Sequence, residues 1–280
     1  MTIDTDSLFI KLGKFFVDNG INLNEFDEDK IIKIVLNLSK IIEEHVNMRV
    51  FEEVQLQDYN SQVTDFKIEF KQEIVAKRAL FVKKKKYAYW CVNEDGLTVD
   101  KLCVTGLEVV RSDSGIAARK KIKVVMEMIL KDAAEDKLIE TIDKYKKELR
   151  VVPAEEIAAN ITTNNIGKYL SEGKPIKGTP WHIKGVYNYR MLLDKLNLEN
   201  KYEDINEGTK SKVLYVKKNP YNIETVTFTV WPKEFNDVLT IDYDVMMEKF
   251  FINKIKMLLE PMGKESMLDN KKKSLGMFFK

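Results

Sequence analysis

The sequence has few of the side chains that build structural metal sites or disulfide frameworks. Its 280 residues include two cysteines, Cys91 and Cys103, and two histidines. The cysteines lack the close spacing of zinc ligands, and a chain of this length needs no disulfides in order to fold. We therefore expect no structural zinc and a reducing compartment.

Long apolar runs and a leader-like start are also missing. No stretch of about 18 apolar residues occurs, which argues against a membrane-spanning helix. Residues 1–9 do not show the basic and then apolar order of a secretory signal peptide. These absences predict a cytoplasmic protein without membrane contacts.

Charged residues are abundant but almost balanced. They make up 32% of the chain, with 46 Lys and Arg against 44 Asp and Glu. Because the net charge is only +2, attraction to a polyanion depends on local clusters. Two lysine clusters occur, at residues 83–86 and 271–273.

The spacing of apolar residues changes near residue 102. Before it, a helical pattern at residues 28–47, with Asp27 as N-cap, precedes strand-like runs near residues 66–70, 79–82 and 87–92. After it, helical spacing dominates, with a β excursion at residues 213–216 and 226–231. The predicted helices cover residues 114–131, 134–149, 154–159, 180–196 and 242–258. Because strands close in sequence favour antiparallel pairing, we predict an α+β fold.

The first motif with chemical potential is acidic. Residues 3–10 alternate around Asp4-Thr5-Asp6-Ser7, which predicts a tight hairpin with both aspartates at its turn. Two close carboxylates form a hard-oxygen site suited to Mg²⁺, an ion that neutralises developing charge in phosphoryl transfer. The alternative, which these four residues alone favour, is a solvated acidic turn.

The second motif is the basic run at residues 83–86, followed by Tyr87. Four lysines in a strand context cannot all be buried, so one face is basic. An aromatic ring beside that face suits contact with a sugar or base. A charged edge strand that blocks aggregation explains the same residues equally well.

Four further segments carry polar or apolar groups at helix ends and at the C-terminus. Residues 106–115 lead into a helix that Asp113 or Ser114 can cap, where free N–H groups suit phosphate; an ordinary cap is the alternative. Residues 162–169 and 177–185 have the hydroxyls, amides and lysines that hold a nucleic-acid backbone, or are simply polar loops. The apolar tail, residues 274–279, packs on this chain or enters a groove on another protein.

Taken in order, these segments resemble family B DNA polymerases, most closely those of T-even-type phages, from Ile3 to Phe279. Asp4 to Ser7 resembles the third palm motif, residues 70–76 a palm strand, and residues 84–87 the lysine-tyrosine motif. Residues 106–114 resemble the palm-to-thumb connection. Residues 164–169 and 180–185 resemble thumb segments, and the tail resembles a peptide that docks on the sliding clamp.

The chain departs from the family pattern at four places. Thr2-Ile3 replace a Tyr and a small residue before the acidic motif, and Lys86 replaces an Arg. Gly115 replaces a Pro, so the start of the next helix is expected to be looser. Lys184 also replaces an Arg, which keeps the charge but loses the bidentate fork.

The resemblance implies three regions: the end of a palm at residues 1–102, a mainly helical thumb with a small β insertion at residues 103–262, and a flexible clamp-binding tail at residues 263–280. It implies Asp6 as the main Mg²⁺ ligand with Asp4 as its neighbour, both catalytic, and Glu73 near the metal. The implied primer and duplex contacts are Lys84, Lys85, Lys86, Tyr87, Arg111, Ser112, Thr162, Lys168, Tyr169, Lys177, His182 and Lys184. The implied clamp contacts are Leu275, Met277, Phe278 and Phe279.

The family's other parts, namely an earlier palm aspartate, the fingers and the exonuclease, are absent from these 280 residues. We therefore predict half of a split DNA-directed DNA polymerase that binds primer-template DNA, dNTP, Mg²⁺, a sliding clamp and an N-terminal polymerase chain, in a bacterial host cytoplasm if phage-encoded. The alternative is a non-catalytic DNA-binding or sliding-clamp adaptor protein derived from a polymerase thumb. A third possibility is an artificial or mis-started fragment.

Overall fold

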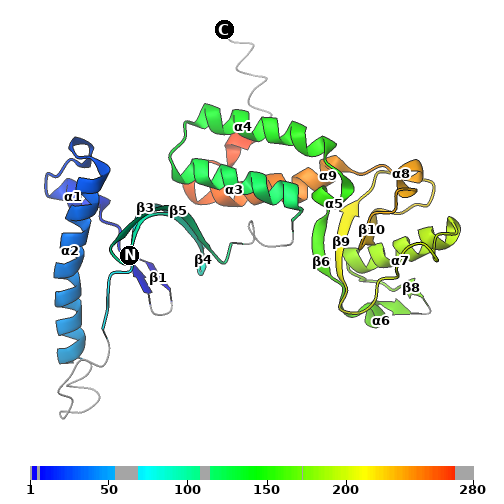
Figure 1. The fold of residues 1–280 in the computed structure, drawn as a ribbon, viewed down its shortest axis with the longest axis horizontal. Helices are drawn as coiled ribbons and strands as arrows, with labels where there is room; N and C mark the ends of the chain where they lie inside the picture. The colour runs from blue at the N-terminus through cyan, green and yellow to red at the C-terminus, as the bar shows by residue number, and fades with distance from the viewer. Residues whose placement is uncertain (1, 5–6, 54–68, 108–113, 172, 269–280) are drawn as a thin grey trace, which may run out of the picture. The chain divides into compact units, whose positions relative to one another are not determined.

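The structure is a computed structural model that describes residues 2–4, 7–53, 69–107, 114–171 and 173–268 (Figure 1). The chain divides into two compact units, Met1–Thr105 and Gly106–Lys280. Both units combine helices with small antiparallel sheets, so the predicted α+β fold is confirmed. Whether the units are a palm and a thumb is taken up below as a proposal.

The described residues of the first unit include a hairpin, two α-helices, a short 3-10 helix (Leu23–Glu25) and a three-stranded sheet. β1 (Thr2–Asp4) pairs antiparallel with β2 (Ser7–Phe9), as predicted for a tight hairpin. α1 (Gly13–Asp18) and α2 (Glu28–Arg49) follow, and the Asp27 carboxylate caps α2 by accepting from the Lys30 amide at 2.8 Å. The helix and its cap were both predicted.

The sheet of the first unit has the order β3-β4-β5, with β3 (Ile74–Lys83), β4 (Lys86–Glu94) and β5 (Leu97–Thr105) all antiparallel. β3 and β4 contain the second and third predicted strand runs. The first run, near residues 66–70, lies partly outside the described residues, and residues 69–73 form no regular strand. β5 was not predicted.

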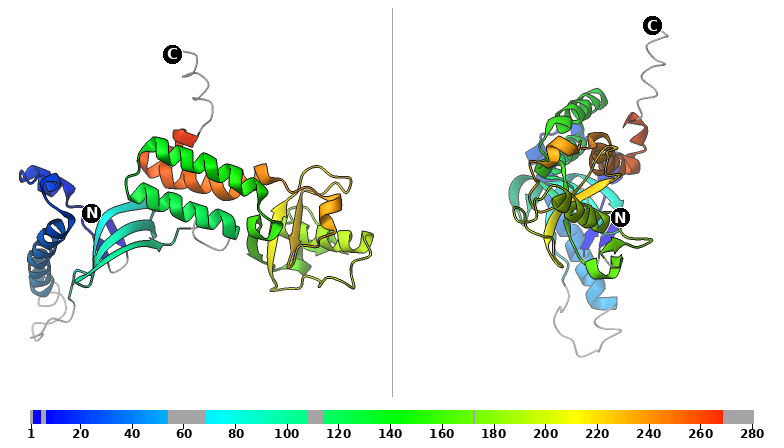
Figure 2. Two further views of the ribbon diagram at one scale, coloured as in Figure 1. Left: turned by 45° about the horizontal axis from the view of Figure 1, so that its top comes forward. Right: turned by 90° about the vertical axis from the view of Figure 1, so that its right-hand side faces the viewer.

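The second unit begins with helices. Each long helix agrees with the prediction, namely α3 (Ile116–Leu130), α4 (Glu135–Glu148) and α7 (Trp181–Lys195). The predicted helix at residues 242–258 is α9 (Tyr243–Met247), a π-helical turn (Glu248–Ile252) and α10 (Asn253–Leu259) in succession. α3 packs against both α4 and α10 (Figure 2). Ile122 and Met126 of α3 are fully buried.

A second sheet lies beside α7 in this unit, with the order β10-β9-β6. Its strands are β6 (Ala159–Thr162), β9 (Lys210–Tyr215) and β10 (Thr225–Phe228). β9 and β10 are the predicted β excursion. Further short elements are α5 (Ala154–Ile157), α6 (Ile166–Tyr169), β7 (Leu170–Ser171), β8 (Lys174–Pro175) and α8 (Phe235–Val238). Short 3-10 helices cover Leu149–Val151, Glu260–Met262 and Glu265–Leu268.

The start of α3 differs from the prediction. Its N-cap is Gly115 and no side chain caps it, while the Ser114 hydroxyl is fully buried without a hydrogen-bond partner; Asp113 lies outside the described residues. A Cβ on Gly115 would lie 2.5 Å from the carbonyl oxygens of Glu156 and Ile157. Close packing on α5 therefore fixes the start of α3, contrary to the looser start expected from the missing proline.

Gly185 allows α7 to pack directly on β10. A Cβ at this position would collide with the Thr227 hydroxyl and lie 2.8 Å from the Thr227 amide nitrogen. The strand in turn binds the first turn of the helix, because Thr225 Oγ1 donates to the Trp181 carbonyl at 3.0 Å and Thr227 Oγ1 to the His182 carbonyl at 2.6 Å. This contact positions the segment at residues 180–185.

We therefore expect Gly185→Ala to destabilise the second unit by about 1–3 kcal/mol, because the added methyl group forces the helix away from a backbone atom. Thermal unfolding should show a melting temperature lower by about 2–10 °C. Gly167→Ala is the matched control, since nothing lies within 4 Å of the position that its methyl group would take and the backbone there is helical. Equal melting temperatures for both variants would contradict the predicted overpacking.

Candidate nucleic-acid and metal site

The acidic hairpin is held against the sheet of the first unit by aromatic rings. The Phe9 ring lies 5.3 Å from Phe81, 5.3 Å from Tyr87 and 6.0 Å from Tyr89, measured between centroids. Phe9 is only two residues after Ser7, the partner of Asp4 across the hairpin. The cluster thus brings the hairpin with the predicted metal ligands to the end of the sheet that carries the lysine-tyrosine motif.

The lysines of that motif form the tip of a second hairpin. Lys83 pairs with Lys86, and Lys84 and Lys85 are the two-residue turn between β3 and β4. Lys85 has a φ of 59°, a left-handed conformation that only a minority of side chains adopt. Lys83, Lys84 and Lys85 are exposed, so their ammonium groups are accessible to an anion.

Tyr87 has a different environment from these lysines. Its side chain is 8% exposed and packs among Phe9, Phe81 and Tyr89. Burial also raises the pKa of the neighbouring Tyr89 hydroxyl. Tyr87 is therefore first of all a core residue that connects the two hairpins, and any contact with a primer would use only the rim of its ring.

In the second unit, the two polar segments predicted to hold a nucleic-acid backbone lie next to each other. The Thr179 hydroxyl and the Ile176 amide both approach the Tyr169 carbonyl oxygen, at 3.0 and 3.1 Å. These bonds join the end of α6 to the loop before α7. The predicted contacts that are exposed here are Thr162, Lys168, Lys177 and Lys184, whereas Tyr169 and His182 are half-buried.

His182 contributes no charge near neutral pH. It lies in the first turn of α7, with its ring at right angles to the Trp181 ring and 6.3 Å away. Burial lowers its pKa below the usual 6.5. At pH 7 the imidazole is therefore neutral and offers a phosphate at most one N–H donor.

The N–H groups at the start of α6 are already occupied. The Glu207 carboxylate accepts from the amides of Asn165 and Ile166, the latter at 2.9 Å. A carboxylate in this position takes the place that a phosphate would need. Sequence reasoning missed Glu207 because it lies about 40 residues away in the chain.

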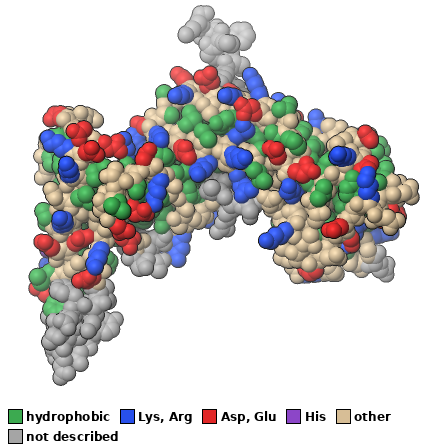
Figure 3. Space-filling model, in the orientation of Figure 1, with side chains coloured by type: hydrophobic (Ala, Val, Ile, Leu, Met, Phe, Trp, Pro, Cys, Tyr) green, Lys and Arg blue, Asp and Glu red, His purple; other side chains and the backbone are tan. Residues whose placement is uncertain are grey.

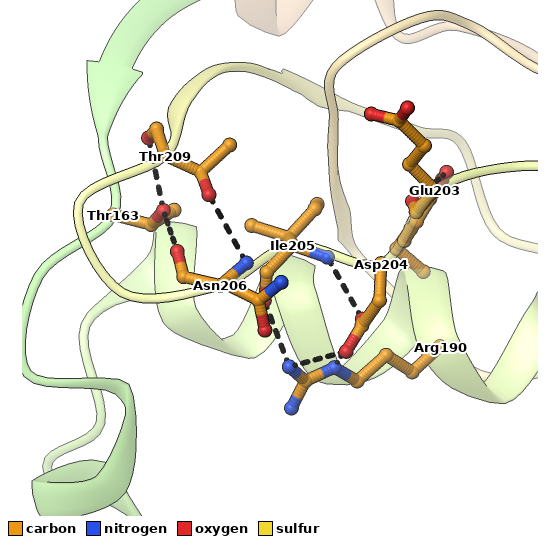
Figure 4. Close-up of polar contacts among 8 residues, drawn as sticks. Thr163, Arg190, Glu203, Asp204, Ile205, Asn206 and Thr209 are labelled. Atoms are coloured by element: carbon orange, nitrogen blue, oxygen red, sulfur yellow. Dashed lines mark hydrogen bonds and ion pairs between the residues drawn. The ribbon is translucent and has the colours of Figure 1, made fainter.

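The loop that carries Glu207 is fixed from both sides (Figure 4). Arg190 of α7 forms a two-pronged ion pair with Asp204, at 2.7 and 3.0 Å, and also donates to the Ile205 carbonyl at 2.8 Å. The buried Thr163 hydroxyl lies 3.1 and 3.0 Å from the carbonyl oxygens of Asn206 and Thr209. The backbone around residues 162–169 is thereby held in one conformation.

Comparison with known proteins gives two relatives, although no family model matches the chain. It is 28% identical over 188 residues to the DNA-directed DNA polymerase of Enterobacteria phage T4, across 64% of this chain and 20% of that protein. It is 30% identical over 202 residues to the DNA-directed DNA polymerase of Escherichia phage RB69, across 68% of this chain and 21% of that protein. The chain is a relative of the T-even-type phage DNA polymerases.

This relationship confirms the predicted resemblance to family B polymerases of T-even-type phages. The polymerase-related chain spans about a fifth of the length of the curated relatives it matches. No helix in its described residues is long and apolar enough to cross a membrane.

Several predicted polymerase residues lie outside the described part of the chain. They are Asp6, Arg111, Ser112 and the tail residues Leu275, Met277, Phe278 and Phe279, together with the side chain of Asp4. Glu73 is described; it is exposed and lies just before β3, at the opposite end of that strand from Phe81. Among the described residues, no three His, Cys, Asp or Glu side chains gather as a metal site.

Proposed function

We propose that this chain is the C-terminal part of a DNA-directed DNA polymerase and that it acts with a partner chain carrying the exonuclease, the fingers and the rest of the palm. In this proposal the first unit is the end of the palm and the second unit is the thumb. The observation that carries it is the relationship to two phage polymerases, of which the chain spans only about a fifth. The host cytoplasm would be the site of action.

The acidic hairpin fits a divalent metal by the chemistry of its donors. Asp4 ends β1, and Asp6 follows two positions later in the sequence, so two carboxylates with hard oxygen donors lie within three residues of the chain. The described residues contain no cluster of three His, Cys, Asp or Glu side chains, and in this proposal the partner chain supplies the remaining protein ligands. When bound, Mg²⁺ would favour deprotonation of the primer 3′-hydroxyl and would neutralise negative charge on the leaving pyrophosphate.

The chain's own residues would hold the DNA. The turn lysines Lys84 and Lys85 are exposed beside the acidic hairpin, which suits the phosphates of a primer end. In the second unit, Thr162, Lys168, Lys177 and Lys184 would bind the backbone of the duplex without reading its sequence. The apolar tail, outside the described residues, would dock on a sliding clamp.

Mixing the purified chain with its partner tests the proposal. We expect primer extension on a short primer-template only when both chains and Mg²⁺ are present, since one chain holds only part of the metal ligands. Extended products would be resolved on a denaturing gel, with each chain alone as the control. Extension by this chain alone, or none by the mixture, would contradict the two-chain polymerase.

A further inference from the structure

One side of α2 carries an apolar stripe with the spacing of a helix–helix seam. The residues follow one another at intervals of three, four, three, four and three positions, which is the a/d pattern of interacting helices. They are Ile31, Ile34, Leu38, Ile41, His45 and Met48. We call this set the α2 stripe; five of its six members are apolar.

The described residues of the first unit leave the second half of the α2 stripe, from Ile41 to Met48, uncovered, whereas Ile31, Ile34 and Leu38 in its first half are half-buried. α2 has 22 residues, yet only Ile32 is buried. In the middle and at the end of the stripe, Ile41 is 63% exposed and Met48 is 51% exposed. Burying an Ile or Met side chain contributes roughly 1.5–3 kcal/mol of free energy. Exposure of both Ile41 and Met48, two helical turns apart on one side of α2, is therefore a feature of a binding surface.

The other side of α2 holds the helix to its own unit. Glu28 pairs with Lys77 at 2.6 Å, and the Asn47 amide exchanges two hydrogen bonds with the Phe70 backbone at 2.9 and 2.7 Å. Ile32, the buried residue, is nine positions from Ile41, which at about 100° per residue places the two on opposite sides of the helix. As far as the described residues show, these attachments of α2 leave Ile41, His45 and Met48 exposed to bind another molecule.

We propose that the α2 stripe is a docking surface for an apolar helix of the partner chain that supplies the rest of the palm; this inference rests on the proposed two-chain polymerase. A polymerase of the matched kind has about four fifths of its length outside this chain. That missing part has to bind here firmly enough to complete the metal site. An apolar helical seam supplies such binding without disturbing the acidic hairpin.

Features of the stripe argue against a second copy of this chain as the occupant. The pattern covers about two and a half heptads, fewer than the three or four that sustain a coiled coil. A parallel pair would also place His45 against His45 at a core position. A larger partner can add contacts elsewhere, because among the described residues β3 and β5 each pair only with β4, so each offers an open edge.

The test compares Ile41→Glu with Lys40→Glu. Ile41 is in the stripe, whereas Lys40 is exposed at the neighbouring solvent-facing position and undergoes the larger change of charge. The probe is the polypeptide from the same genome that carries the exonuclease, fingers and remaining palm. We expect Ile41→Glu to weaken its binding about thirtyfold or more, because a carboxylate enters the apolar seam, and Lys40→Glu to change it less than threefold.

The outcomes separate this inference from the proposed function. If the wild-type chain and Ile41→Glu bind the partner and extend primers equally well, the stripe is not the docking surface, although the polymerase proposal stands. If Ile41→Glu alone loses the partner but even the wild-type pair extends no primer, docking holds and the polymerase proposal fails. Without partner binding by the wild-type chain, both are wrong.

Two measurements on the chain alone exclude other occupants. Sedimentation should show a monomer for wild type and variant, because a dimer that Ile41→Glu dissociates would make a second copy the occupant. The melting temperature should be the same for both, because a fall in the variant would mean that the chain's own residues cover Ile41. Either contrary result overturns the inference.

Discussion

Asp6→Asn should lower primer extension by the two-chain polymerase about a thousandfold and leave its affinity for primer-template DNA unchanged. An amide keeps the size of the carboxylate but loses its charge, and metal stabilisation of transferring phosphoryl groups contributes several kcal/mol to the rate. In the proposed function, DNA binding depends on lysines and hydroxyls elsewhere, so it should persist. Single-turnover extension and fluorescence anisotropy would measure the two properties separately.

Asp18→Asn provides the control for this prediction. Asp18 is an exposed aspartate at the end of α1, in the same unit, and it matches no predicted metal ligand. It should leave both extension and binding at the wild-type level. Unchanged extension in Asp6→Asn would instead favour the non-catalytic DNA-binding or clamp-adaptor function, and loss of DNA binding would show that Asp6 acts in some other way.

Binding of duplex DNA should fall about a thousandfold between 50 and 200 mM salt. Roughly six phosphate contacts by the predicted residues would release about five counterions, and the affinity then varies with about the fifth power of the salt concentration. On the face drawn in Figure 3, Lys and Arg side chains are interspersed with Asp and Glu, in keeping with the net charge of only +2. Fluorescence anisotropy of a labelled duplex at four salt concentrations would give the slope.

Lys184→Ala and Lys218→Ala refine this prediction. Both lysines are exposed in the second unit, but only Lys184 belongs to a predicted backbone contact. We expect Lys184→Ala to reduce the logarithmic salt slope by about 0.9, the value for one lost phosphate contact, and Lys218→Ala to leave it unchanged. Salt-independent binding, or equal slopes for the two variants, would count against a duplex-holding thumb.

The local patterns of the sequence were sufficient for most of the helices. A 3.6-residue apolar repeat marks each of the helices α2, α3, α4 and α7. The start of α2 could also be predicted, because aspartate is a preferred N-cap residue and Asp27 stands at that position. The missed strand β5 also had a signal: Asp95 and Gly96 both have positive φ, and Asp-Gly is a strong hairpin-turn pair. The turn at Lys84 and Lys85 had no such signal, because lysine does not favour the left-handed conformation that Lys85 adopts.

The arrangement of the candidate site could be predicted only in part, because its contacts join distant segments. The sequence identified the acidic hairpin and the lysine turn, but the packing of Phe9 on Tyr87 spans nearly 80 residues and follows no periodic pattern. The same holds for Glu207 at the start of α6. At the start of α3, residue type favoured a Ser114 cap, but tertiary packing of Gly115 decided otherwise.

The packing of Phe9 on Tyr87 has a mechanical consequence for assembly. Phe9 belongs to the second strand of the acidic hairpin, and Tyr87 is the second residue after the lysine turn, so neither hairpin can shift without moving a ring that packs on the other. A protein that adds a strand to the hairpin would also set the position of the lysines. If the proposed function holds, metal coordination and grip on the primer end would then be gained or lost in a single cooperative event.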